Sequence, residues 1–184
     1  MQLPGSIRTH LAAAAAEIRG NTIAVKWVEP ANLHLTLAFL GSIAPDSIET
    51  VAGALLGAAA GEPAFMARIE TLGAFPNPRR PRVIWAGMSA GAPELQRACG
   101  RVRDELRAAD VYFDDKPFSP HVTLGRLRDG VVAPSELLRR LETVRIATEP
   151  FEVGAIHLMK SRLTPSGPIY DALRVAVLGG ESRR

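Results

Sequence analysis

The stretches Leu33-His34-Leu35-Thr36-Leu37 and Pro120-His121-Val122-Thr123-Leu124 carry one pattern and decide how the rest of the chain is interpreted. In each, a His and a Thr two positions later alternate with apolar residues. Side chains alternate between the two faces of a β-strand, so the His and Thr share one face and the apolar residues anchor the other. The first stretch belongs to an alternating segment over 32–40, with Phe39 on the apolar face, which is typical of a half-buried strand. The second opens a strand predicted over 121–127.

The segments around the motifs predict a mixed α+β fold. Apolar spacing, with Pro or Ser near the start and a break after the end, predicts helices at 6–19, 45–60, 91–110 and 134–143. Apolar runs between turn residues predict strands at 22–27, 32–40, 65–75, 82–88, 121–127, 151–163 and 169–178. Ser6 is the predicted N-cap of the first helix. The buried stripe predicted for the third helix is Leu95, Cys99, Val102 and Leu106.

The repeat predicts two lobes related by a pseudo-twofold axis. Each motif follows a helix and a loop and precedes a helix and a strand, so we expect one bilobal domain with helices outside antiparallel-rich sheets and a central cleft. Lobe 1 covers about 1–80, lobe 2 about 81–178, and 179–184 is a polar tail. The strand at 82–88 that opens lobe 2 has no counterpart ahead of the first helix. We therefore expect lobe 1 to lack its first strand, either because the sequence starts one strand late or because the fold omits it; in the second case another segment or molecule would cover the open edge.

Composition places the chain among ordinary folded proteins. Its 184 residues are 47% hydrophobic and 22% charged. A chain of this length can bury a hydrophobic core that is stable without disulfides or a structural metal. The single Cys99 excludes an internal disulfide and a cysteine-based zinc site. No secretory signal or membrane span is predicted, so we expect a cytoplasmic protein. Arg outnumbers Lys among the 22 cationic side chains; this favours an anionic ligand weakly, because compositional bias is the simpler explanation.

Two such motifs on neighbouring strands would bring two imidazoles and two hydroxyls to one cleft. His34 and Thr36 face one way, and His121 and Thr123 do the same. Such a cleft suits a phosphodiester, because the hydroxyls can bind non-bridging oxygens while one imidazole activates water and the other protonates the leaving oxygen. An unperturbed imidazole pKa of about 6.5 suits both tasks. The chemistry requires no metal and no cofactor, and the symmetry of the motifs leaves open which histidine is the acid.

These residues resemble a known family. The two motifs, together with the stretches at 37–41 and 73–76 and the Gly125-Arg126 pair after the second motif, are similar to the two-histidine phosphoesterase superfamily. Within it the chain is most similar to bacterial and archaeal RNA 2',3'-cyclic phosphodiesterases, historically called 2'-5' RNA ligases. The resemblance covers residues 3 to about 178. It departs at the start, where family members usually have a short apolar strand.

The resemblance implies a bilobal fold and hydrolysis of terminal 2',3'-cyclic phosphates to 2'-phosphomonoesters, with reverse 2'-5' ligation by the same groups. Carried over by position, His34 is the proton donor to the departing 3'-oxygen, and His121 is the proton acceptor that activates water. Thr36 and Thr123 hold the phosphate. The implied partners are RNA ends or nucleoside cyclic phosphates, with no membrane and no obligate protein partner.

Further candidate residues outside the motifs are Arg79, Arg80, Arg82, Phe118, Arg126 and Tyr170. Strand parity points Arg126 away from His121 unless a bulge intervenes. The three arginines near the prolines either follow an RNA backbone or form a solvated loop. The phenylalanine either stacks on a base or, as we favour, packs in the core. The tyrosine would reach a ligand from the turn that precedes it.

Two other interpretations stay open. A non-catalytic nucleotide- or RNA-binding module would use the same cleft, although a binder needs no matched acid and base. A metal site would use the two histidines as ligands. The sequence has no Gly-rich phosphate loop, which argues against nucleoside triphosphate hydrolysis. Turnover of a nucleoside 2',3'-cyclic phosphate, its pH profile and its response to a chelator would separate these interpretations.

Overall fold

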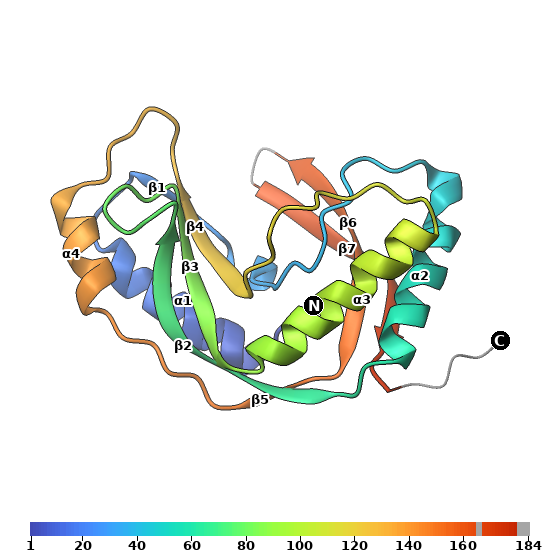
Figure 1. Ribbon diagram of the computed structural model, residues 1–184. Helices are drawn as coiled ribbons and strands as arrows, with labels where there is room; N and C mark the ends of the chain where they lie inside the picture. Colours follow the sequence, from blue (N-terminus) through green and yellow to red (C-terminus); the bar gives the residue numbers. More distant parts are fainter. Residues whose placement is uncertain (165–166, 180–184) are drawn as a thin grey trace.

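The computed structural model describes residues 1–164 and 167–179, and its helices are interspersed among its strands (Figure 1). The helices are α1 (Gly5–Arg19), α2 (Ile48–Ala60), α3 (Ala92–Ala108) and α4 (Ser135–Thr143), with 3-10 turns at η1 (Pro30–Asn32) and η2 (Pro45–Ser47). The strands are β1 (Val25–Trp27), β2 (Phe65–Phe75), β3 (Val83–Ala90), β4 (His121–Leu127), β5 (Phe151–Val153), β6 (Ala155–Thr164) and β7 (Gly167–Val177). These elements confirm the predicted mixed α+β fold.

The strands form two antiparallel sheets. The five-stranded sheet has the order β1-β4-β3-β2-β5, and β6 pairs with β7 in a separate hairpin. Helix α1 lies beside β4 of the five-stranded sheet, and α4 packs against α1; α2 lies beside the hairpin, and α3 packs against α2 (Figure 1). Within the described residues, no helix is both long enough and apolar enough to span a membrane.

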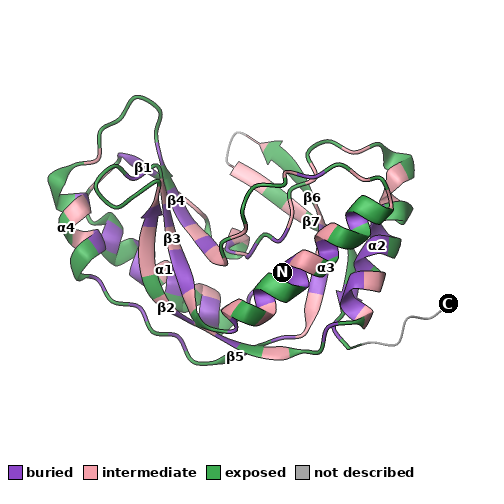
Figure 2. Ribbon diagram, in the orientation of Figure 1, coloured by how far each residue is buried: buried purple, intermediate pink, exposed green. Residues whose placement is uncertain are grey.

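The core forms where the helices meet the sheets, and buried positions follow the faces of the elements that touch (Figure 2). The predicted stripe of α3 is buried in full. One buried charge also joins the helices, because the carboxylate of Glu62, 2% exposed, lies 3.1 Å from Arg97 Nε and 2.9 Å from Arg101 Nε. A buried carboxylate requires such partners, so this cluster fixes the end of α2 against α3.

Three local predictions were wrong. Pro4 rather than Ser6 stands at the N-cap of α1, and Ser6 lies inside the helix. The strand predicted over 32–40 forms bridges only at His34 and Leu35, and Phe39 is 66% exposed. An alternating pattern becomes a strand only where a neighbour pairs with it, and the ladder does not extend to Phe39. The strand predicted over 151–163 is interrupted at Gly154, because β5 pairs with β2 and β6 pairs with β7.

The first residues of the chain pair with the first motif. Gln2 bridges His34, the Leu35 amide donates to the Met1 carbonyl over 3.1 Å, and the Met1 amine donates to the Leu35 carbonyl over 2.8 Å. Burial lowers the pKa of that amine to about 5. The edge that the sequence predicts to be open is therefore paired over these residues. The turn predicted at 164–168 and the tail predicted at 179–184 lie partly outside the described residues.

Candidate active site

The two motifs lie on adjacent antiparallel segments. Leu35 bridges Val122, and both side chains are buried in the core at 2% and 0% exposure. The register of this bridge places His34 opposite Thr123 and Thr36 opposite His121, all on the other face. Diagonal positions of such a pair are about 7–8 Å apart. The two histidines are therefore diagonal neighbours on one surface, which we call the motif face.

Each histidine ring is held by the backbone two residues before it. Nδ1 of His34 lies 2.7 Å from the carbonyl oxygen of Asn32, and Nδ1 of His121 lies 2.7 Å from that of Ser119. A carbonyl only accepts, so in the neutral ring the proton sits on Nδ1 and Nε2 is unprotonated. Nε2 is thus the atom that can take or return a proton in both motifs.

The two histidines have different surroundings. His34 packs against Tyr170, with ring centroids 5.0 Å apart and an interplanar angle of 60°. Burial lowers the pKa of His34; the hydrogen bond to Asn32 opposes this effect, and the positive charge of the nearby N-terminal amine adds to it. His121 contacts the rings of Phe75 at 5.1 Å and Trp85 at 6.4 Å. The His34 ring therefore contacts the β7 hairpin, whereas the His121 ring contacts an aromatic floor formed by Phe75 and Trp85 on the five-stranded sheet.

Two glycines make room for that floor. Gly73 pairs with Trp85 across β2 and β3, and a Cβ added at Gly73 would overlap the indole ring. A Cβ at Gly87 would lie 2.8 Å from the same ring. Trp85 therefore lies over bare backbone beside Phe75, whose ring is 5.3 Å away. We did not predict Trp85 or Phe75 as site residues, because only the strand register shows which glycines face them.

A bulge changes the direction of Arg126. Trp85 pairs with Thr123 and Ile84 pairs with Gly125, so Leu124 is the extra residue and strand parity reverses after it. Arg126 then pairs with Val83, which lies on the same face of β3 as Trp85. The exception that we attached to the strand-parity prediction therefore applies, and Arg126 faces the same way as His121. Arg126 is exposed on the motif face.

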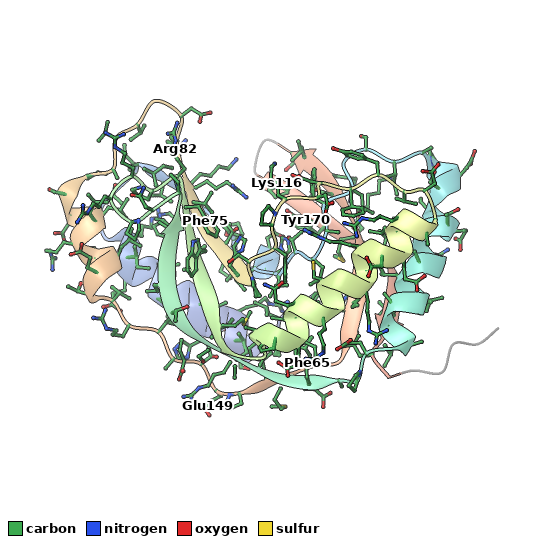
Figure 3. The ribbon with its side chains drawn as sticks, in the orientation of Figure 1. Phe65, Phe75, Arg82, Lys116, Glu149 and Tyr170 are labelled. Carbon is green, nitrogen blue, oxygen red and sulfur yellow. The ribbon has the colours of Figure 1, made fainter. Side chains whose placement is uncertain are left out.

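The remaining candidates divide between the site and its periphery. Tyr170 contacts His34 from β7, and Phe75 contacts His121 from β2. Figure 3 labels Tyr170 on the hairpin and Phe75 on the five-stranded sheet. Phe118 packs against the core, as we favoured. The candidates that lie exposed in the β2–β3 connection are Arg79, Arg80 and Arg82. Over residues 1–164 and 167–179, no group of three or more His, Cys, Asp or Glu side chains is arranged to hold a metal ion.

Matched His-x-Thr motifs on neighbouring antiparallel segments, with Nδ1 of each histidine 2.7 Å from a carbonyl oxygen, are the arrangement expected of a two-histidine phosphoesterase. The model of the family described as LigT like Phosphoesterase matches the chain over residues 2–85 and 87–170. The chain belongs to this family.

Known relatives and solved structures cover most of the chain. It is 38% identical to a protein of Aquifex aeolicus named RNA 2',3'-cyclic phosphodiesterase, covering 84% of this chain and 82% of that protein. A protein of the same name from Archaeoglobus fulgidus is 35% identical, covering 92% and 93%. A crystal structure of a Thermus thermophilus protein has a TM-score of 0.77 at 30% identity, covering 97% and 95%. The E. coli LigT structure with 3'-AMP has a TM-score of 0.76 at 25% identity, covering 97% and 94%.

Proposed function

We propose that the protein hydrolyses 2',3'-cyclic phosphate ends of RNA or nucleotides to 2'-phosphomonoesters. The observation that carries this proposal is the Leu35–Val122 bridge, whose register places His34 and His121 as diagonal neighbours, each opposite a threonine. The names of the relatives support the substrate, because they are RNA 2',3'-cyclic phosphodiesterases. A ribonucleotide in the E. coli LigT structure supports the ligand class.

In the mechanism we propose, His121 Nε2 takes a proton from water, and the water oxygen forms a bond to phosphorus. The bond from phosphorus to the 3'-oxygen breaks, and His34 donates a proton from Nε2 to that oxygen. Thr36 and Thr123 donate hydrogen bonds to the non-bridging oxygens. Each proton transfer contributes about 10²–10⁴ in rate. The acid and base assignments follow the family resemblance.

The surroundings of His34 support its role as acid. Burial lowers the pKa of this imidazole, so its protonated form gives up a proton more readily. A bound phosphodiester carries a negative charge, and an adjacent opposite charge favours the protonated ring. Substrate binding would therefore favour protonation of His34, which supplies the proton that the leaving oxygen requires. We further propose that reverse 2'-5' ligation uses the same four groups and that neither direction needs a metal.

The test is product analysis with a cyclic-phosphate-ended oligonucleotide and a nucleoside 2',3'-cyclic phosphate. We expect a 2'-phosphate product, a bell-shaped pH profile, and unchanged turnover in excess chelator. His34→Ala and His121→Ala should each lose about 10²–10⁴ in kcat while remaining folded. His10→Ala, on the exposed side of α1, is the matched control. Binding of the cyclic nucleotide without turnover would instead support the non-catalytic module, and retained activity in either motif variant would contradict the mechanism.

A further inference from the structure

Thr71 on β2 lies in the same row across the sheet as His121. Thr71 pairs with Gly87 of β3, and Gly87 pairs with His121 of β4. The register shifts between Ile69 and Thr71, so Glu70 is an extra residue and strand parity reverses after it. Ile69 is fully buried, whereas Thr71 is exposed on the opposite face, which is the motif face. A bulge therefore turns the Thr71 side chain to the surface that carries the two histidines.

The hydroxyl of Thr71 occupies the space that Gly87 leaves beside His121. A Cβ added at Gly87 would lie 2.5 Å from Thr71 Oγ1. Paired residues of an antiparallel sheet have Cβ atoms about 4.5–5.5 Å apart, so this hydroxyl lies on the order of 5 Å from the Cβ of His121. The His121 ring in turn reaches toward β2, since its centroid is 5.1 Å from that of Phe75 on this strand. Gly87 has no side chain to separate the hydroxyl from the ring.

The Thr71 hydroxyl has no partner within the protein. Over residues 1–164 and 167–179, no hydrogen bond uses Thr71 Oγ1. Other exposed threonines differ, because Thr9 and Thr143 donate to carbonyls of their own helices. A hydroxyl offers one donor and two acceptor sites. All of them are therefore available to a molecule that binds on the motif face.

We propose that Thr71 positions the water that attacks phosphorus. This inference rests on the proposed function and deepens it, because it adds a third group to the step in which His121 acts as base. A water bound between two polar groups spans about 5–6 Å. It gives one proton to His121 Nε2 and donates its other hydrogen to Thr71 Oγ1, which leaves a lone pair directed at phosphorus.

The bonds change as follows when Thr71 holds the water. The water oxygen forms a bond to phosphorus, and one of its protons passes to His121. The bond from phosphorus to the 3'-oxygen breaks, and His34 protonates that oxygen. The hydrogen donated to Thr71 stays on the new phosphate oxygen, so Thr71 itself neither gains nor loses a proton.

The test compares water with methanol as the nucleophile that opens a nucleoside 2',3'-cyclic phosphate. Methanol has a single hydroxyl hydrogen, which passes to His121, and a methyl group replaces the hydrogen that Thr71 accepts. Thr71→Val therefore removes a hydrogen bond from water and none from methanol. In a fixed water–methanol mixture we expect kcat for hydrolysis to fall about five- to tenfold in this variant, with KM changed less than about twofold. The ratio of 2'-methyl phosphodiester to 2'-phosphomonoester should rise by the same factor.

Two controls accompany Thr71→Val. Thr71→Ser keeps the hydroxyl and should keep kcat and the product ratio within about twofold. Thr50→Val makes the same chemical change on the exposed side of α2, away from the site, and should alter neither. The product ratio does not depend on the fraction of folded protein, so it separates a lost hydrogen bond from lost stability.

An unchanged product ratio in Thr71→Val would overturn the proposal, whether hydrolysis and methanolysis fall equally or neither falls. A higher KM with unchanged kcat would also overturn it, because it would assign Thr71 to substrate binding. Either result, with normal hydrolysis by the unmodified protein, would leave the proposed function intact. Absence of hydrolysis by the unmodified protein would instead reject the proposed function, and this inference with it.

Discussion

The two motifs have the same sequence pattern and the same ring geometry, but the structure supports them differently. His121 opens the seven-residue strand β4, which pairs with β3 over most of its length. His34 lies in a segment that forms only isolated bridges, to Gln2 and, through Leu35, to Val122. The hydrogen bond from Nδ1 to a carbonyl two residues earlier is nevertheless 2.7 Å in both. The orientation of the ring is therefore a local property of the motif.

The residues that surround each ring come from distant parts of the sequence. Tyr170 on the β7 hairpin covers His34, whereas Phe75 and Trp85 from β2 and β3 flank His121. Asn32, whose carbonyl holds His34, also donates from its side chain to the Pro168 carbonyl over 2.8 Å. Ser119 holds His121 only through its carbonyl, among the residues that the structure describes. Two chemically similar histidines therefore have different surroundings.

The largest effect should come from removing both histidines. If they act on one phosphorus as a unit, the His34→Ala/His121→Ala variant should lose little more than the worse single variant, about 10²–10⁴ in kcat, because either loss stops the reaction. Single-turnover hydrolysis of a nucleoside 2',3'-cyclic phosphate measures this. Losses that multiply in the double variant would mean that the two motifs contribute independently.

A smaller effect should follow from filling the space under the aromatic floor. Gly73→Ala places a methyl group in the Trp85 ring and should lower the free energy of unfolding by about 1–3 kcal/mol, with reduced activity. Gly53→Ala on α2 meets no atom within 4 Å and should be neutral or stabilising by up to about 1 kcal/mol. Urea unfolding of both variants makes the comparison. Equal stability of the two variants would show that Trp85 does not lie over Gly73.

The link between Asn32 and the hairpin should matter for one motif only. Asn32→Ala removes the hydrogen bond to Pro168 and should lower kcat about three- to tenfold, because Tyr170 and His34 lose their fixed relation. Ser119→Ala keeps the carbonyl that holds His121 and should change kcat less than twofold, which is within the effect of an ordinary surface substitution. Steady-state kinetics on both variants test this asymmetry. Equal losses of kcat in the two variants would show that the side chain of Asn32 does not cause the difference between the motifs.

The smallest effect concerns the titration of His34. Burial lowers the pKa of this ring, so below the ordinary value of about 6.5 the unfolded chain binds a proton more readily than the folded one. The contribution of His34 to stability should therefore fall as the pH drops from that value through the folded pKa. Tyr170→Ala should expose the ring and raise its pKa, whereas Phe75→Ala should leave it unchanged. NMR titration of the imidazole would contradict this account if neither variant moved the His34 pKa.

Sequence reasoning predicted the features that depend on nearby residues. The bounds of β2 and β4, the buried stripe of α3 and the shared direction of each His and Thr all follow from short-range periodicity. The roles of the four motif residues and the lobe boundaries stay predictions.

The features that sequence reasoning missed depend on pairing between distant segments. The extra residue at Leu124 reverses the direction of the Arg126 side chain. Phe39 is exposed because the strand pairing ends before it. The position of Trp85 over Gly73 follows only from the β2–β3 register. The Asn32–Pro168 hydrogen bond joins residues that no local pattern relates.

The most direct measurement is a crystal structure of the protein with a nucleoside 2'-phosphate. Our account predicts one phosphate on the motif face, with Nε2 of His34 and Nε2 of His121 on opposite sides of it, each within about 3 Å of an oxygen on the phosphorus or the ribose. Thr36 and Thr123 should contact its remaining oxygens. Histidine nitrogens more than about 10 Å apart, too far for both to reach oxygens on a single phosphorus, or a phosphate bound away from residues 34 and 121, would contradict the account.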